Sequence, residues 1–192
     1  MSFPIHQLNP ARAEIHGLIF ENAPVGVPLG LYWSLFLHFE PFEYAGDRLE
    51  CNLSAEWIRL PVRDWRQLEG QTVEGGPEVI ECSFYTVEHD LATKTQVRIG
   101  DRYDQSFDLQ WDAIVEFGGV ADGDADAAMR LGARAIAEFG GIQIHSSLVE
   151  PDEPMRDRAS ALLARFVDAE RFGRLELRTN EFGVRSWWLR PV

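Results

Sequence analysis

Residues 107–117 read FDLQWDAIVEF, and their alternation decides the class of fold. Apolar side chains stand at every second position, and charged or amide side chains fill most of the positions between them. Successive residues of a β-strand point to opposite faces of the sheet, so this period of two predicts a strand with one buried and one wet face. The buried side would consist of Phe107, Leu109, Trp111, Ala113, Val115 and Phe117.

Patterns elsewhere in the chain predict that this strand belongs to a large sheet. Residues 95–99 alternate in the same way and are followed by Gly100-Asp101, a turn pair that predicts a hairpin with 107–117. Residues 79–87 are apolar on both faces, which is typical of a central strand. Further strands are predicted at residues 15–20, 33–39, 55–60, 175–177 and 184–189, the last two as a closing hairpin.

Residues 127–139 fit two structures. Their alanine content favours a helix, and four of their apolar residues would share one helical face. Alternation over the same residues fits a strand. Because Gly140-Gly141 is followed by a second alternating stretch at 142–146, we predict a strand at 127–139 that forms a hairpin with it.

One amphipathic helix is predicted near residues 154–171. Acidic residues and Pro154 stand at its start and Gly173 follows its end, which are typical start and stop signals. Its spacing predicts about four turns. A single helical turn is also predicted at 63–68. The apolar face of the long helix would be formed by Met155, Ala159, Leu162, Leu163, Phe166 and Val167.

These elements predict a mostly β, β-rich α+β fold, with a large antiparallel, meander-like sheet and the helix near 154–171 packed on it. The pattern leaves open whether the sheet is curled and open or closes into a barrel. Residues 1–192 are predicted to form a single globular domain, because 45% of the chain is hydrophobic and no stretch resembles a linker.

The chain is strongly acidic, with a formal net charge of −13. This field repels phosphate backbones, so nucleic acid is not an expected partner, whereas a basic protein partner suits it. No apolar run reaches the roughly 20 residues of a membrane-spanning helix, and the first ten residues lack the pattern of a secretory signal. We therefore predict a cytoplasmic location without membrane contact, with Cys51 and Cys82 as reduced, partly buried thiols.

No local pattern identifies a catalytic, metal or cofactor site, and we predict neither a metal nor a cofactor. Five histidines fall on different predicted elements, and no pair has the spacing that places two imidazoles on one metal. His38 and Glu40 share a strand face, where a buried pair is an alternative to a structural histidine. The histidines are His6, His16, His38, His89 and His145.

Two acidic stretches resemble functional sites without matching them. Glu88, His89 and Asp90 are consecutive, so on a strand their side chains would point to alternating faces. The acidic stretch at 122–126 is similar to the start of a calcium loop, where alternate carboxylates converge on the cation. That loop then needs a glycine and a glutamate at positions occupied here by Ala127 and Ala133, so we interpret the stretch as a solvated acidic loop.

One segment concentrates cationic and aromatic side chains in this acidic chain. Its members are Trp57, Arg59, Arg63, Trp65 and Arg66. Tryptophan and arginine are enriched at interface hot spots, so the segment is a candidate ligand or interface site. The alternative is structural, with Trp57 packed inward and the arginines paired with nearby acids.

Three functional hypotheses follow. The first is a non-enzymatic cytoplasmic interaction protein whose acidic surface binds a basic protein, as an inhibitor or immunity-like protein does. The second is a β-protein that binds a small apolar ligand in a pocket. The third is a hydrolase or isomerase that uses a spatial His–carboxylate or His–Cys pair. For the second, the predicted lining residues are Trp33, Phe36, Trp111 and Phe117.

Overall fold

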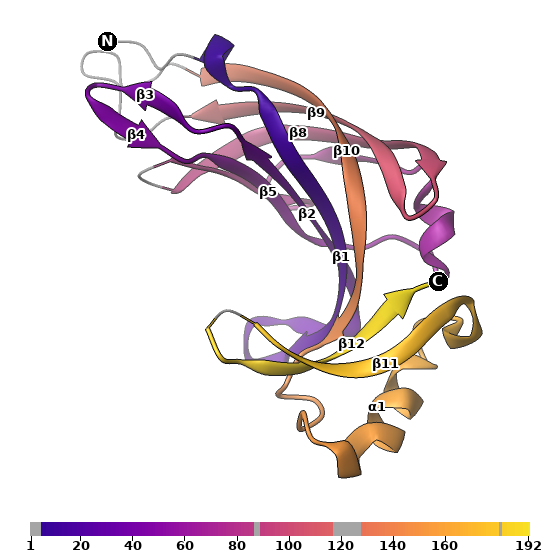
Figure 1. Cartoon of the computed structure of the whole chain (residues 1–192). Helices are drawn as coiled ribbons and strands as arrows, with labels where there is room; N and C mark the ends of the chain where they lie inside the picture. Colours follow the sequence, from indigo (N-terminus) through magenta and orange to yellow (C-terminus); the bar gives the residue numbers. More distant parts are fainter. Residues whose placement is uncertain (1–4, 87–88, 117–127, 181) are drawn as a thin grey trace.

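A ten-stranded sheet dominates the computed structural model, which describes residues 5–86, 89–116, 128–180 and 182–192 (Figure 1). The predicted β-rich class with a large antiparallel sheet is confirmed. A separate hairpin pairs β3 (Phe42–Tyr44) with β4 (Asp47–Leu49). The strands of the large sheet are β1 (Pro10–Asn22), β2 (Val27–Phe39), β5 (Asn52–Ile58), β6 (Thr72–Gly75), β7 (Glu81–Tyr85), β8 (His89–Tyr103), β9 (Ser106–Glu116), β10 (Ala128–Ile144), β11 (Phe172–Thr179) and β12 (Arg185–Pro191).

Seven of these strands form a closed ring of pairings. Strands β1, β2, β5, β7, β8, β9 and β10 follow one another as an antiparallel meander, and β10 then pairs with β1 in parallel. The two strands run side by side along the bend of the molecule (Figure 1). Each of the seven strands therefore pairs with two neighbours in the ring.

Strand β10 confirms the predicted strand over the described residues 128–139, but the predicted hairpin at Gly140-Gly141 is wrong. The chain continues through the glycines to Ile144, with an irregularity in its register against β1. Gly141 has φ +110°, and a Cβ there would lie 2.6 Å from the carbonyl oxygen of Leu189. The glycines therefore allow a close backbone approach where β10 changes its antiparallel partner from β9 to β12.

The hairpin of β8 and β9 is confirmed, although its turn lies further along the chain than predicted. Gly100 and Asp101 are inside β8, at an irregularity in its register, and the turn falls at Asp104-Gln105. Asp104 adopts φ 55°, a left-handed conformation that aspartate tolerates better than most residues. Strand β7 begins two residues later than predicted, at Glu81, and Val79 before it is exposed. Val87, the predicted last residue of the strand, lies outside the described residues.

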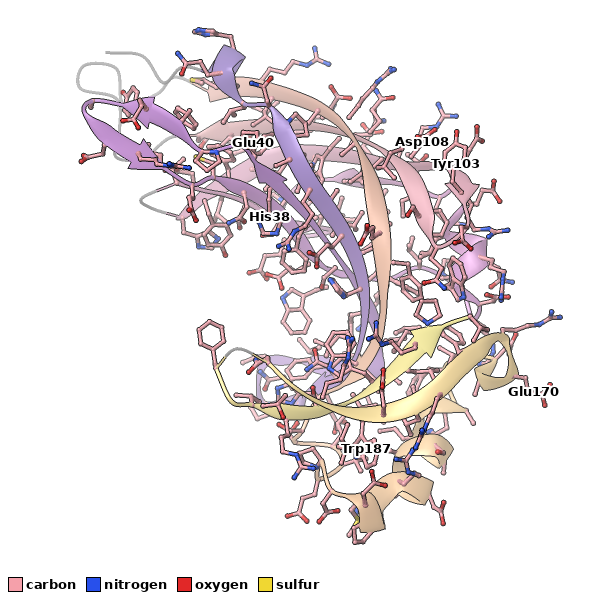
Figure 2. All side chains as sticks on the ribbon, in the orientation of Figure 1. His38, Glu40, Tyr103, Asp108, Glu170 and Trp187 are labelled. Atoms are coloured by element: carbon pink, nitrogen blue, oxygen red, sulfur yellow. The ribbon has the colours of Figure 1, made fainter. Side chains whose placement is uncertain are left out.

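The predicted helix exists but is shorter than four turns. The region contains the 3-10 turn η4 (Glu153–Met155), the helix α1 (Arg156–Leu163) and the 3-10 turn η5 (Ala169–Arg171). Trp187 of β12 lies between the β11–β12 hairpin and α1, and its indole donates to the carbonyl of Glu150 at 3.0 Å (Figure 2). The helix thus packs on the closing hairpin of the sheet, as Figure 1 shows.

Large aromatic side chains fill the interior of the molecule. Trp65, on the 3-10 turn η3 (Trp65–Leu68), stacks on Phe139 with a centroid distance of 5.2 Å and meets Phe107 edge-on at 5.9 Å. Trp33 and Trp111 are almost fully buried in the same core. Two further 3-10 turns, η1 (Ile5–Gln7) and η2 (Ala23–Val25), lie near the start of the chain. Among the described residues, no helix combines the length and hydrophobicity needed to cross a membrane.

Candidate functional site

The structure separates the five predicted site residues into two groups. Trp57 and Arg59 lie together at the end of β5, where both line a surface pocket. Trp65 is buried in the core, with an exposed fraction of 1%. Arg63 and Arg66 bond to the region around α1 and to the end of the chain. The pocket around Trp57, which we call the Trp57 pocket, is therefore the candidate site.

Trp57 is placed in the pocket by a bulge in β5. The register between β2 and β5 shifts by one residue between the pairs Leu35–Ala55 and Trp33–Ile58. Trp57 takes up this extra residue with φ 60°, a left-handed conformation that is a clear outlier for a bulky side chain. Backbone strain of this kind persists only where the surroundings enforce it, and it concentrates at functional sites.

Aromatic rings surround the indole of Trp57. Phe20 of β1 lies 4.9 Å away between ring centroids, and Tyr32 of β2 lies 5.8 Å away, edge-on. His145, directly after β10, meets Phe20 edge-on at 4.9 Å between ring centroids. Strands β1, β2 and β5 and the residue after β10 thus contribute one aromatic cluster. The cluster buries part of each ring and fixes the position of Trp57.

Arg59 is held in position by Tyr32. Its Nη2 donates to the hydroxyl oxygen of Tyr32 at 2.9 Å, and that hydroxyl donates to the carbonyl oxygen of Pro28 at 2.6 Å. The guanidinium also lies over the Tyr32 ring, 5.2 Å from its centroid. The side chain is exposed, yet two kinds of contact limit its rotamers, so a ligand would meet a preorganised cation.

The pocket has a volume of about 790 Å³ and is open to solvent. Val25 and Val79 stand at its rim with 69% and 53% of their surface exposed. Val25 ends the 3-10 turn η2, and Gly26 follows it with a φ of 81°, which suits glycine. The lining residues are Phe20, Asn22, Val25, Gly26, Val27, Tyr32, Trp57, Ile58, Arg59, Val73, Pro77, Glu78, Val79 and Glu81.

Carboxylates give one side of the Trp57 pocket a negative potential. Glu78 and Glu81 line it and are exposed, and Glu81 lies directly opposite Glu56 on the neighbouring strand. Burial and the charge of Glu81 raise the pKa of Glu56, against a smaller opposing effect of His89. Among the described residues, no lysine or arginine forms an ion pair with these carboxylates.

Arg63 and Arg66 connect parts of the fold. Arg63 donates to the carbonyls of Ala164 and Arg165, just beyond α1, and approaches Asp168 at 3.2 Å. The guanidinium of Arg66 bonds to Asp64 and to the backbone oxygens of Arg171 and Val192. The ion pairs with Asp168 and Asp64 agree with the structural alternative for these two arginines, whereas Trp57 lines a surface pocket and is not packed inward as that alternative required.

The histidines do not assemble into one site. His16 Nε2 lies 2.7 Å from Glu14 Oε2, and Arg12 contacts both Glu14 and His38. The nearest bonded neighbour of His38 is thus Arg12, at 3.4 Å, rather than Glu40 (Figure 2). No group of three or more acidic, histidine or cysteine side chains suited to a metal occurs among the described residues.

The other residues considered at the sequence level lie in the core or outside the described part. Trp33 and Trp111 are buried, and neither they nor Phe36 line the Trp57 pocket. His89 is exposed and Asp90 is buried, so adjacent residues do point apart. Cys51 and Cys82 are free and buried, and burial raises the pKa of each thiol to about 11. Phe117, Glu88 and the acidic stretch 122–126 lie outside the described residues.

Comparisons with models of protein families, with curated proteins and with solved structures find no match to this chain.

Proposed function

We propose that this chain is a non-enzymatic interaction protein that binds a basic protein partner at the Trp57 pocket. The observation that carries the proposal is the half-buried Trp57, held in a left-handed bulge between Phe20 and Tyr32 at an open surface depression. Strain at a bulky residue needs a reason, and presentation of the indole to a partner supplies one.

The composition of the pocket supports a protein partner. Tryptophan, tyrosine and arginine are the residue types that most often dominate binding energy at interfaces, and all three occur here at contact distance. Val25 and Val79 add exposed apolar surface at the rim. Because Tyr32 already limits the motion of Arg59, little side-chain entropy remains to be lost on binding.

Charge supports a basic partner. The pocket offers Glu78 and Glu81 against the single cation Arg59, and the whole chain carries a net charge of −13. Such a field accelerates association with a basic protein and selects against acidic ones. An inhibitor or an immunity-like protein that covers a basic target would use this chemistry.

The test compares captured partners between variants. The purified full chain and its Trp57→Ala variant are each immobilised, and nuclease-treated lysate of the native cells is passed over them. We expect the wild type to retain a basic protein that Trp57→Ala loses. With that protein purified, the substitution should weaken binding by about 30-fold, the effect of a hot-spot tryptophan.

Phe182→Ala is the matched control, because Phe182 is an aromatic residue with 81% of its surface exposed and lies outside the pocket. It should leave binding unchanged.

A second pair of variants tests the charge of the pocket. The double variant Glu78→Gln with Glu81→Gln should slow association with the partner. The control double variant, Asp157→Asn with Glu170→Gln, removes two exposed charges elsewhere and should slow association less. Equal capture by the wild type and Trp57→Ala would overturn the proposal. A different outcome would favour the small apolar ligand. In that case no basic protein is captured, and the wild type binds the apolar dye Nile red saturably while Trp57→Ala does not.

A further inference from the structure

A second surface hollow lies on the outer face of strands β8, β9 and β10. The register places Arg98, Gln110 and Arg134 side by side in one row across the three strands. Two strand spacings separate the arginines, about 10 Å between Cα atoms, and both arginines line the hollow together with Gln110. Both side chains are exposed, and within the described part of the chain neither has a hydrogen bond or an ion pair.

Two carboxylates line the same hollow beside the arginine row. Asp101 and Asp108 belong to β8 and β9, and the hollow has a volume of about 530 Å³. The carboxylate of Asp108 accepts a hydrogen bond from the Tyr103 hydroxyl at 3.2 Å, which fixes its position (Figure 2). Gly100 forms part of the floor, and a Cβ there would lie 3.1 Å from the Cβ of Asp108.

The two pairs of charges sum to zero within the hollow. A simple anion is attracted by the arginines but repelled by the aspartates, and a simple cation is attracted by the aspartates but repelled by the arginines. A molecule that carries both charges can be attracted by both pairs at once. Arginine pairs well with carboxylates because its planar fork offers parallel donors.

We propose that this hollow binds a small zwitterion, with its carboxylate between Arg98 and Arg134 and its ammonium group at Asp101 and Asp108. The site shares no lining residue with the Trp57 pocket and does not depend on the function proposed for it. Ile136, with 54% of its surface exposed, offers apolar contact to the body of the ligand.

The experiment is an amide NMR titration of the full chain with glycine, β-alanine and 4-aminobutyrate, and with acetate and ethylammonium as single-charge probes. We expect at least one zwitterion to shift Gly100 and Gln110 and to bind about tenfold more tightly than acetate, because it makes a second charge-assisted contact. Acetate that binds as tightly as every zwitterion, or zwitterions that shift neither residue at their highest soluble concentration, would overturn the proposal.

Variants assign the two halves of the ligand. Arg98→Gln with Arg134→Gln should weaken zwitterion binding by about tenfold or more. Arg130 is exposed, lies on β10 like Arg134 and does not line the hollow, so Arg130→Gln should leave zwitterion binding unchanged. Asp101→Asn should weaken the binding of the zwitterion yet strengthen the binding of acetate. Weaker binding of both ligands would contradict the proposed position of the ammonium group. These positions are exposed, and thermal unfolding of each variant confirms that the fold is intact.

Discussion

Glu56 on β5 lies directly opposite Glu81 on β7, so two carboxylates face each other across neighbouring strands beside the Trp57 pocket. Like charges at such positions destabilise a sheet. Burial, and then the repulsion from Glu81, raises the pKa of Glu56. The arrangement lowers stability, and a cation bound at the pocket would relieve part of the repulsion.

The first prediction concerns stability and pH. Because the pKa of Glu56 is higher in the folded than in the unfolded chain, the folded state holds more protons between the two values, and stability falls as pH rises through that window. Glu56→Gln should remove this loss and raise the free energy of unfolding at pH 7 by about 0.5–1 kcal/mol. Urea unfolding from pH 4 to pH 8 measures the effect.

Glu170→Gln controls for net charge, because Glu170 is exposed and lies on the turn η5, outside the sheet that holds Glu56 and Glu81. It should change stability much less than Glu56→Gln. Equal gains from both substitutions would mean that overall charge, and not the cross-strand pair, sets the effect.

The second prediction concerns the end of α1. Arg63 donates to the carbonyls of Ala164 and Arg165, groups that a helix end leaves without intrahelical partners. Arg63→Ala should lower the free energy of unfolding by about 1–2 kcal/mol. Its ion pair with Asp168 is half exposed and contributes little, so Asp168→Asn should cost less. Arg158→Ala, at an exposed position within α1, serves as the control in the same urea titrations.

The third prediction concerns thiol chemistry. Burial raises the pKa of Cys51 and Cys82 to about 11, so at pH 8 little thiolate is present and access is blocked. Both thiols should react with Ellman's reagent only as fast as the chain unfolds, and at once in guanidinium. Ser160→Cys places a thiol at an exposed helical position and should react rapidly in the folded protein. Rapid reaction of two thiols in the wild type would contradict the burial.

Alternation in the sequence was enough to predict most of the sheet. The stretches 33–39 and 107–116 fall within β2 and β9, because a face that is buried along a whole strand repeats every two residues. The turns predicted at Gly140-Gly141 and at Gly100-Asp101 are wrong, because both pairs lie inside strands. Gly140-Gly141 allows β10 to approach β12 closely, and this requirement comes from a strand nearly 50 residues away, so local spacing does not contain it.

The helix was predicted too long for a related reason. Phe166 and Val167 continue the helical spacing of apolar residues, but both amides bond to the carbonyl of Leu163 in a closing turn, and Arg63 takes the carbonyls that follow. The arginine comes from the segment before η3, about 100 residues earlier. Long-range capping therefore ends the helix where the local pattern would extend it.

The candidate site was predicted only in part. The local density of tryptophan and arginine pointed to Trp57 and Arg59, but equally to Arg63, Trp65 and Arg66, which stabilise the fold. The bulge at Trp57 separates the two groups, and it depends on the register between β2 and β5. Phe20 and Tyr32 join the pocket because β1 pairs with β2 and β2 with β5, and no local pattern around Trp57 indicates this pairing.

The last prediction tests the bulge itself. A left-handed residue costs a side chain other than glycine about 1–2 kcal/mol, so Trp57→Gly should be more stable than Trp57→Ala although both lose the aromatic contacts. At Trp188, an indole on β12 with ordinary strand geometry, the order should reverse, because glycine in a strand is about 0.5–1 kcal/mol worse than alanine. Urea unfolding of the four variants gives both differences. Alanine more stable than glycine at both sites would mean that Trp57 is not held in the left-handed region in solution, and the aromatic pocket built on that bulge would then lose its geometric basis.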